Sequence, residues 1–214
     1  MAFVALAVGA CGAPDEEAKP RPLPEETREL EPGAYRTEEF EPAFSFEVSE
    51  GWSSQPPETY DLLLLARSEG VVGLGFANLR GARFFKPTET GDAYMVDALE
   101  DVAGWFQRHP YLKIEETRRV AVGGKEGTRI DYVLADLPNG YESGCGSTMC
   151  VNLVRFSSGG RPLVLLEEDK ARLVFLDDVE GETVVTGFSL PAAVFDDHAP
   201  EAQRVIDTVE WRGG

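Results

Sequence analysis

Hydrophobic and polar residues alternate along much of the chain, which is the pattern of half-buried β-strands. The clearest stretch is Ala43 to Val48, where every second side chain is apolar, and Gly51-Trp52 then breaks the alternation. Four pairs of short apolar runs, each pair separated by a glycine-containing turn, predict β-hairpins. Their strands are 60–66 with 71–77, 119–122 with 127–135, 150–156 with 163–167, and 172–177 with 183–190.

Residues 92–108 follow the helical period instead. Their apolar side chains Val96, Leu99, Val102 and Phe106 recur at three- and four-residue spacing. We expect this helix to end before Pro110, because proline disfavours helical geometry in the residue that precedes it.

A second helical stripe begins at Phe195 and reaches Val209. Asp196 or Asp197 is the expected N-cap, with Pro200 in the first turn, and a short strand is expected at 209–211. Hairpins combined with two separated helices predict an α+β fold, in which an antiparallel sheet built of hairpins carries two main helices packed on it.

The chain begins with an uncharged apolar stretch that ends in small residues and a cysteine. Residues 2–10 are far shorter than the about 20 apolar residues that span a bilayer, but they suit the apolar region of an export signal. Val8-Gly9-Ala10-Cys11 resembles the bacterial lipobox, in which the cysteine receives a lipid after cleavage. We therefore expect a signal peptide at 1–10 and a lipid on Cys11. No basic residue precedes Lys19, although export signals usually start with one, so an ordinary secretory signal is the alternative.

Residues 11–32 are acidic, rich in proline and poor in apolar side chains. Such a composition does not bury enough apolar surface to offset its ordering entropy, and we expect a disordered, extended tether. The remaining residues, 33–214, have the length of a single domain with its own core.

The formal net charge of −18 restricts the partners. Binding to nucleic acid needs a basic face, and peripheral docking on anionic lipid needs basic clusters, so both are disfavoured. The expected partners are the membrane, reached only through the lipid on Cys11, and an envelope protein or small ligand outside the cytoplasm.

Two further cysteines stand close together in Gly144-Cys-Gly-Ser-Thr-Met-Cys150. In an oxidising compartment we expect Cys145 and Cys150 to form a disulfide, which stabilises such a short loop by about 2 kcal/mol. A zinc site would need two more ligands, and a redox-active pair usually has two intervening residues, so these roles are weaker alternatives.

No catalytic motif emerges from the sequence, and we predict no cofactor and no metal site. The acidic group Asp177, Asp178, Glu180 and Glu182 lacks the spacing of an EF-hand loop and is interpreted as a hairpin turn. Gly73-Leu-Gly75 lacks the third glycine of a phosphate-binding loop. Trp52, Trp105 and Trp211 are interpreted as core anchors, with a ligand cleft as the alternative.

Several stretches resemble a group of uncharacterised exported bacterial proteins, in which a "PG-x-Y-x-T" strand leads through "F-x-P-x-x-x-F-x-V" to a Gly-Trp turn. The matching stretches are 30–52, 102–110, 120–127, the Cys145/Cys150 loop, 174–185 and 199–211. The resemblance implies an exported lipoprotein whose α+β domain is PsbP-like. It brings no catalytic residues, and fold alone does not imply function.

Two hypotheses about function follow. The first is a non-enzymatic ligand- or protein-binding module, tethered to the outer face of the cytoplasmic membrane. The second is an envelope-acting enzyme of unrecognised type, which would require residues such as His109, His198 or Asp131 to converge on one deep pocket. We favour the first, because the sequence offers no catalytic constellation.

Overall fold

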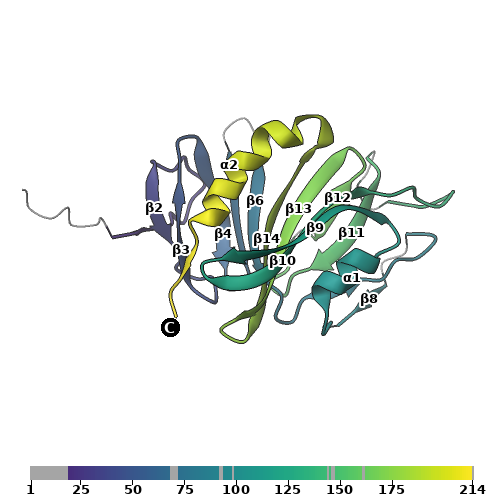
Figure 1. Ribbon diagram of the computed structural model, residues 1–214, viewed down its shortest axis with the longest axis horizontal. Helices are drawn as coiled ribbons and strands as arrows, with labels where there is room; N and C mark the ends of the chain where they lie inside the picture. Colours follow the sequence, from purple (N-terminus) through teal and green to yellow (C-terminus); the bar gives the residue numbers. More distant parts are fainter. Residues whose placement is uncertain are drawn as a thin grey trace, which may run out of the picture.

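The alternating segments form three sheets in the computed structural model, which describes residues 19–67, 72–91, 94–97, 99–143, 145, 148–160 and 162–213 (Figure 1). The largest, here called the large sheet, has seven strands in the order β4-β5-β6-β14-β13-β10-β9, and all its pairings are antiparallel. Its strands are β4 (Trp52–Thr59), β5 (Leu62–Arg67), β6 (Gly73–Asn78), β9 (Leu112–Val122), β10 (Lys125–Leu134), β13 (Asp169–Val179) and β14 (Glu182–Pro191).

Two smaller sheets flank the large one. The N-terminal sheet has the order β1-β2-β3-β15, with β1 (Arg21–Pro22), β2 (Gly33–Arg36), β3 (Phe44–Val48) and β15 (Glu210–Trp211). The other, here called the cover sheet, has the order β12-β11-β7-β8, with β7 (Arg83–Phe85), β8 (Met95–Val96), β11 (Cys150–Arg155) and β12 (Leu163–Leu166). Among the described strands only β1 and β2 pair in parallel.

The four predicted hairpins are confirmed as the pairs β5–β6, β9–β10, β11–β12 and β13–β14. The turn between β9 and β10 consists of Gly123 and Gly124, with φ of 55° and 77°. Both values lie in the left-handed region that a two-residue hairpin turn requires, which explains the glycine pair. Strand β9 is longer than the predicted 119–122, and β4 was not foreseen, since a strand begins at Trp52 where a turn was expected.

Helix α2 (Phe195–Asp207) is the predicted C-terminal helix, preceded by the 3₁₀ turn η1 (Ala192–Val194). The N-cap position belongs to Val194, without a side-chain hydrogen bond, so the expected Asp196 or Asp197 cap is wrong. Both aspartates lie in the first turn, where their negative charges interact favourably with the positive end of the helix dipole. Pro200 lies inside the helix and beyond its first turn.

Helix α1 (Val102–Arg108) is much shorter than the predicted 92–108. The side chain of Asp101 accepts a hydrogen bond of 2.7 Å from the Gly104 N–H and caps the helix at this point. Before the cap the chain forms strand β8, and Val96 and Leu99 still pack on the core from outside the helix. Their helical spacing is therefore misleading, because Val96 and Leu99 pack on the core although the chain around them is not helical. Residues 92, 93 and 98 lie outside the described part.

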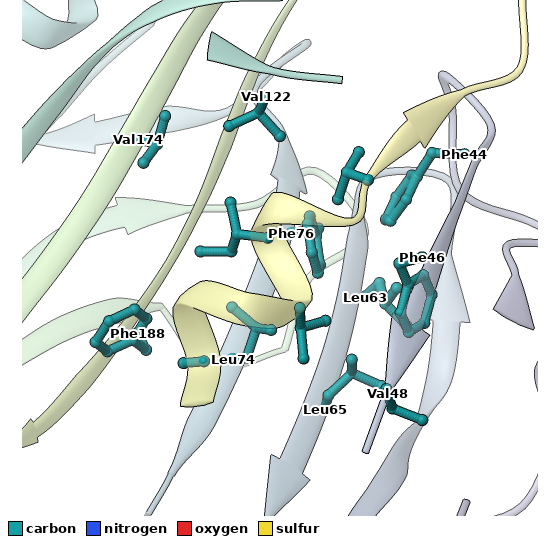
Figure 2. Packing of buried hydrophobic residues seen from close by; sticks show 14 of the residues in the cluster. Phe44, Phe46, Val48, Leu63, Leu65, Leu74, Phe76, Val122, Val174 and Phe188 are labelled. Carbon is teal, nitrogen blue, oxygen red and sulfur yellow. The ribbon is translucent and has the colours of Figure 1, made fainter. Parts of the chain in front are cut away.

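The two faces of the large sheet carry separate cores. The first core lies between the large sheet, α2 and the N-terminal sheet. Figure 2 shows Phe44, Phe46 and Val48 of β3 beside Leu63 and Phe76 of the large sheet, with α2 close by. The second core lies between the opposite face, the cover sheet and α1, so the large sheet is the central layer of the molecule (Figure 1).

Residues 19–32, which were expected to belong to a tether, contribute to the fold. Strand β1 pairs with β2, and Leu23 and Leu30 are buried in the first core. The Arg21 guanidinium also lies over the Tyr35 ring, with 4.5 Å from Cζ to the ring centroid. The expectation of an extended tether through residue 32 thus does not hold for residues 19–32, because two leucines supply apolar surface that the average composition hides. Residues 1–18 lie outside the described part.

Candidate functional site

An apolar cavity of about 280 Å³ lies on the second-core face of the large sheet. Strands β5, β6, β13 and β14 form its floor, and the β11–β12 hairpin with its connecting residues covers it. The lining residues are Leu62, Leu64, Gly75, Ala77, Phe156, Pro162, Leu163, Val164, Leu173, Val185, Thr186 and Gly187.

Two facing glycines form part of the floor of this cavity. Gly75 of β6 lies directly opposite Gly187 of β14. A Cβ at Gly75 would lie 3.3 Å from Cδ2 of Leu64, so a larger side chain there would crowd Leu64, which also lines the cavity. A Cβ at Gly187 would lie 2.1 Å from the Arg172 carbonyl oxygen, so this position accepts only glycine without a shift of the backbone.

The chemistry of the lining is uniform, since no lining residue carries an ionisable side chain. Thr186 has the one polar side chain, and its hydroxyl already donates to the Gly75 carbonyl oxygen at 3.0 Å. Leu64 is 42% exposed, which places an apolar side chain in contact with solvent beside the cavity. Such a site stabilises an uncharged apolar group by removing its surface from water, and it offers nothing to a buried charge.

The opposite face of the large sheet carries the strongest charge cluster. Asp131 of β10 is buried and accepts hydrogen bonds from Arg172 at 2.9 and 2.7 Å and from Arg129 at 3.1 Å. Arg129 also contacts Glu116. The Asp131 carboxylate is thus held by two guanidinium groups in charge-assisted hydrogen bonds. The cluster therefore reads as a closed structural network.

His109 lies in the second-core region rather than beside Asp131. Its Nδ1 accepts a hydrogen bond from the Tyr111 N–H at 3.3 Å, and its ring packs edge-on against Trp105 at 4.9 Å between centroids. Burial lowers its pKa to about 4, so it is neutral at pH 7. Its Nε2 has no hydrogen-bond partner among the described residues.

His198 is partly exposed on α2, with its Nδ1 4.0 Å from a carboxylate oxygen of Glu201. The three candidate catalytic residues therefore lie in different environments: His109 in the second-core region, Asp131 in the closed network and His198 on the helix surface. None of the three lines the apolar cavity. The convergence around one pocket that the enzymatic alternative required is thus not found at this cavity.

The tryptophans serve as core anchors and do not share a cleft. Trp52 is fully buried in the first core, and Trp211 packs against that core while its Nε1 donates to the Val122 carbonyl oxygen at 3.0 Å. Trp105 packs against the second core. None of them lines the apolar cavity, which agrees with the core interpretation.

The acidic group at 177–182 lies at the end of the β13–β14 hairpin, around the turn at Glu180-Gly181, in agreement with the interpretation as a hairpin turn. Asp178 accepts a hydrogen bond of 3.0 Å from the Gly181 N–H, and Glu182 pairs with Arg80 at 3.1 Å. Across the described residues, no group of three or more His, Cys, Asp or Glu side chains is arranged to hold a metal ion.

Cys145 and Cys150 form the predicted disulfide, with their Cα atoms 6.0 Å apart. Cys150 is buried at the start of β11, so the bond fixes the loop that enters the cover sheet. Cys11, the predicted lipid site, lies outside the described residues. In the described part of the chain, no helix has the length and apolarity needed to cross a membrane.

Sequence reasoning did not find the cavity. Its lining comes from the hairpins β5–β6, β11–β12 and β13–β14 with their connections. Each hairpin is predictable from its sequence, but no local pattern shows that the three meet around one hollow. One signal is present in Gly73-Leu-Gly75, because two glycines depart from the side-chain alternation of a strand. Glycine inside a strand also marks a close approach or a hollow, which is its role at Gly75.

No protein family and no curated protein matches the sequence. The chain is similar to the solution structure of cyanobacterial PsbP (CyanoP) from Synechocystis sp. PCC 6803, with 8% sequence identity and a TM-score of 0.47. The alignment covers 86% of this chain and 95% of that one. We transfer no function or site from that protein.

Proposed function

We propose that this chain is a non-enzymatic binding module whose apolar cavity holds the apolar part of a small ligand. The cavity carries the proposal, because it is a preformed hollow of about 280 Å³ without an ionisable lining residue. A cavity of about 150 Å³ already binds benzene, and small-molecule pockets start at about 300 Å³. A small ligand therefore suits this site better than a protein surface does.

The binding proposal is tested with n-decanol as the probe and amide chemical shifts as the readout. We expect saturable shifts at Ala77 and Val185, which line the cavity. Gly75→Val fills the hollow and should weaken binding at least tenfold. Gly73→Val is the matched control on the same strand, since a Cβ at Gly73 meets no atom within 4 Å.

Two results would contradict the proposal. One is equal affinity of the Gly75→Val and Gly73→Val variants for decanol. The other is a set of shifts that avoids the lining residues in the wild-type chain. Thermal unfolding of both variants serves as the control that distinguishes a loss of binding from a loss of folding.

We further propose that the module is exported and held at the outer face of the cytoplasmic membrane by a lipid on Cys11. The lipobox-like Val8-Gly9-Ala10-Cys11 supports this, and a disulfide between Cys145 and Cys150 suits an oxidising compartment. Expressed in a bacterium, the chain should partition into the detergent phase, and Cys11→Ala should move it to the aqueous phase. Cys145→Ala is the control and should stay with the detergent, whereas equal partitioning of wild type and Cys11→Ala would refute the anchor.

A further inference from the structure

Strand β9 ends the large sheet, so one side of its backbone faces away from β10. The β9–β10 hairpin has a two-residue turn, and the closing residues of such a turn, Val122 and Lys125, exchange both backbone hydrogen bonds. Every second residue back from Val122, namely Val120, Arg118 and Glu116, therefore directs its N–H and C=O groups toward β10.

The residues between them direct their backbone groups outward. These are Ala121, Arg119 and Thr117, and all three are exposed. Within the described residues, no other strand pairs with this side of β9. The middle of β9 is thus an accessible row of backbone donors and acceptors, which is a template for pairing with another strand.

The side chains along this edge restrict which strand fits. Glu116 lies opposite Asp131 and Arg118 lies opposite Arg129, so both side chains belong to the α2 face of the sheet. Glu116 and Arg118 also form an ion pair with each other. Below Glu116 the ladder shifts by one residue, which leaves Glu116 to Val122 as the regular stretch.

Charge selects one register for a second copy of β9 in an antiparallel, two-fold arrangement. A two-fold axis at Glu116, Arg118 or Arg119 would place each of these residues opposite its own like charge, which is destabilising. An axis at Val120 or Ala121 forms no opposite-charge pair. An axis at Thr117 places Glu116 of each copy opposite Arg118 of the other, and it faces no like charges.

We infer that this chain associates with a second copy of itself through β9, with the two-fold axis at Thr117. The outward N–H and C=O groups of the two Thr117 residues exchange hydrogen bonds at the centre. On the α2 face, two Glu116 and two Arg118 side chains form a square with opposite charges along each strand and across the junction. Within the regular stretch, residues 116–118 of each copy face one another, so the two large sheets join through these three residues.

The same charges explain why this edge does not pair indiscriminately. Charged side chains on an edge strand oppose pairing with unrelated strands and with most registers of the strand itself. The net charge of −18 also keeps copies apart at long range. At 0.15 M salt this repulsion is screened beyond about 8 Å, whereas the local Glu–Arg pairs act within that distance.

Cross-linking tests both the contact and its register. In the full chain carrying Cys11→Ser, Thr117→Cys places the two new thiols on the axis, where facing Cα atoms are about 5.5 Å apart and a disulfide needs about 4.4–6.8 Å. Arg119→Cys is the matched control, because its two copies would lie four residues apart, about 14 Å along the strands. We expect Thr117→Cys to form the disulfide-linked dimer at least tenfold faster under mild oxidation.

Charge reversal supplies a second test in the Thr117→Cys background. Arg118→Glu would face Glu116 of the other copy and should slow cross-linking about tenfold. Arg83→Glu changes the net charge equally but lies in the cover sheet beside Asp97, and it should leave the rate unchanged. Equal rates for Thr117→Cys and Arg119→Cys, or equal effects of Arg118→Glu and Arg83→Glu, overturn the inference.

Discussion

At the scale of single residues, the burial of the His109 imidazole makes the stability of the fold depend on pH in the acidic range. Its pKa is lowered from 6.5 to about 4 because burial disfavours the charged ring. The unfolded chain therefore binds more protons at His109 between pH 6.5 and pH 4. The stability that this residue contributes is complete above pH 6.5 and is lost as the pH falls toward 4, by about 2 kcal/mol at pH 4.5.

The variant His109→Asn isolates this contribution. The Asn side-chain oxygen takes the place of Nδ1 as acceptor for the Tyr111 N–H, and the residue does not titrate. The loss of unfolding free energy between pH 7 and pH 4.5, measured in urea, should shrink by about 2 kcal/mol relative to wild type. An unchanged loss would show that His109 is already protonated in the folded state.

At the scale of elements, the Cys145–Cys150 disulfide closes the loop that leads into β11. It restricts the unfolded chain, so Cys145→Ser should lower the free energy of unfolding by about 2 kcal/mol. Reduced wild type should match the variant in urea titrations, and the Cys11→Ser chain should match oxidised wild type. A variant as stable as oxidised wild type would contradict the prediction.

The elements also show which sequence signals were sufficient. The hairpins were predictable because apolar runs and glycine turns are local, as at Gly123-Gly124. The start of α1 was not, because the apolar spacing of Val96 and Leu99 continues through residues that are not helical, and the Asp101 cap decides the boundary. Strand β4 was not predictable in this way, because the glycine at position 51, with φ of 89°, predicts a turn but does not show that a new strand starts at the next residue.

The candidate site escaped prediction for a different reason. Leu64 and Gly75 pair directly in the predictable β5–β6 hairpin, whereas Leu163 belongs to β12 in the cover sheet. Only the tertiary arrangement brings the β12 residue over that hairpin. The sequence could suggest a binding module by the lack of catalytic motifs, but it held no local pattern for the cavity itself.

At the scale of the whole molecule, one sheet serves both cores. In β13, Val174 and Leu176 point into the first core, whereas Leu173 and Phe175 point into the second. Because alternate residues of the same strand hold both cores, neither core should unfold without the other.

Tryptophan fluorescence tests this cooperativity. Trp105→Phe leaves Trp52 and Trp211 as reporters of the first core, and the double variant Trp52→Phe/Trp211→Phe leaves Trp105 as the reporter of the second. In each protein the fluorescence midpoint in urea should coincide with the circular dichroism midpoint. Separate midpoints would show that the cores unfold independently.

The N-terminal sheet has a consequence for the connectivity of the chain. It contains both β1 and β15, which lie at its opposite edges with two strands between them. Three strand spacings of about 4.8 Å place Arg21 and Trp211 at roughly 14 Å across the sheet. A short glycine-serine linker spans that gap, and the exposed turn at Glu180-Gly181 offers a place to open the chain. The fold is therefore suited to circular permutation, in which the two ends are joined and new termini are placed at this turn.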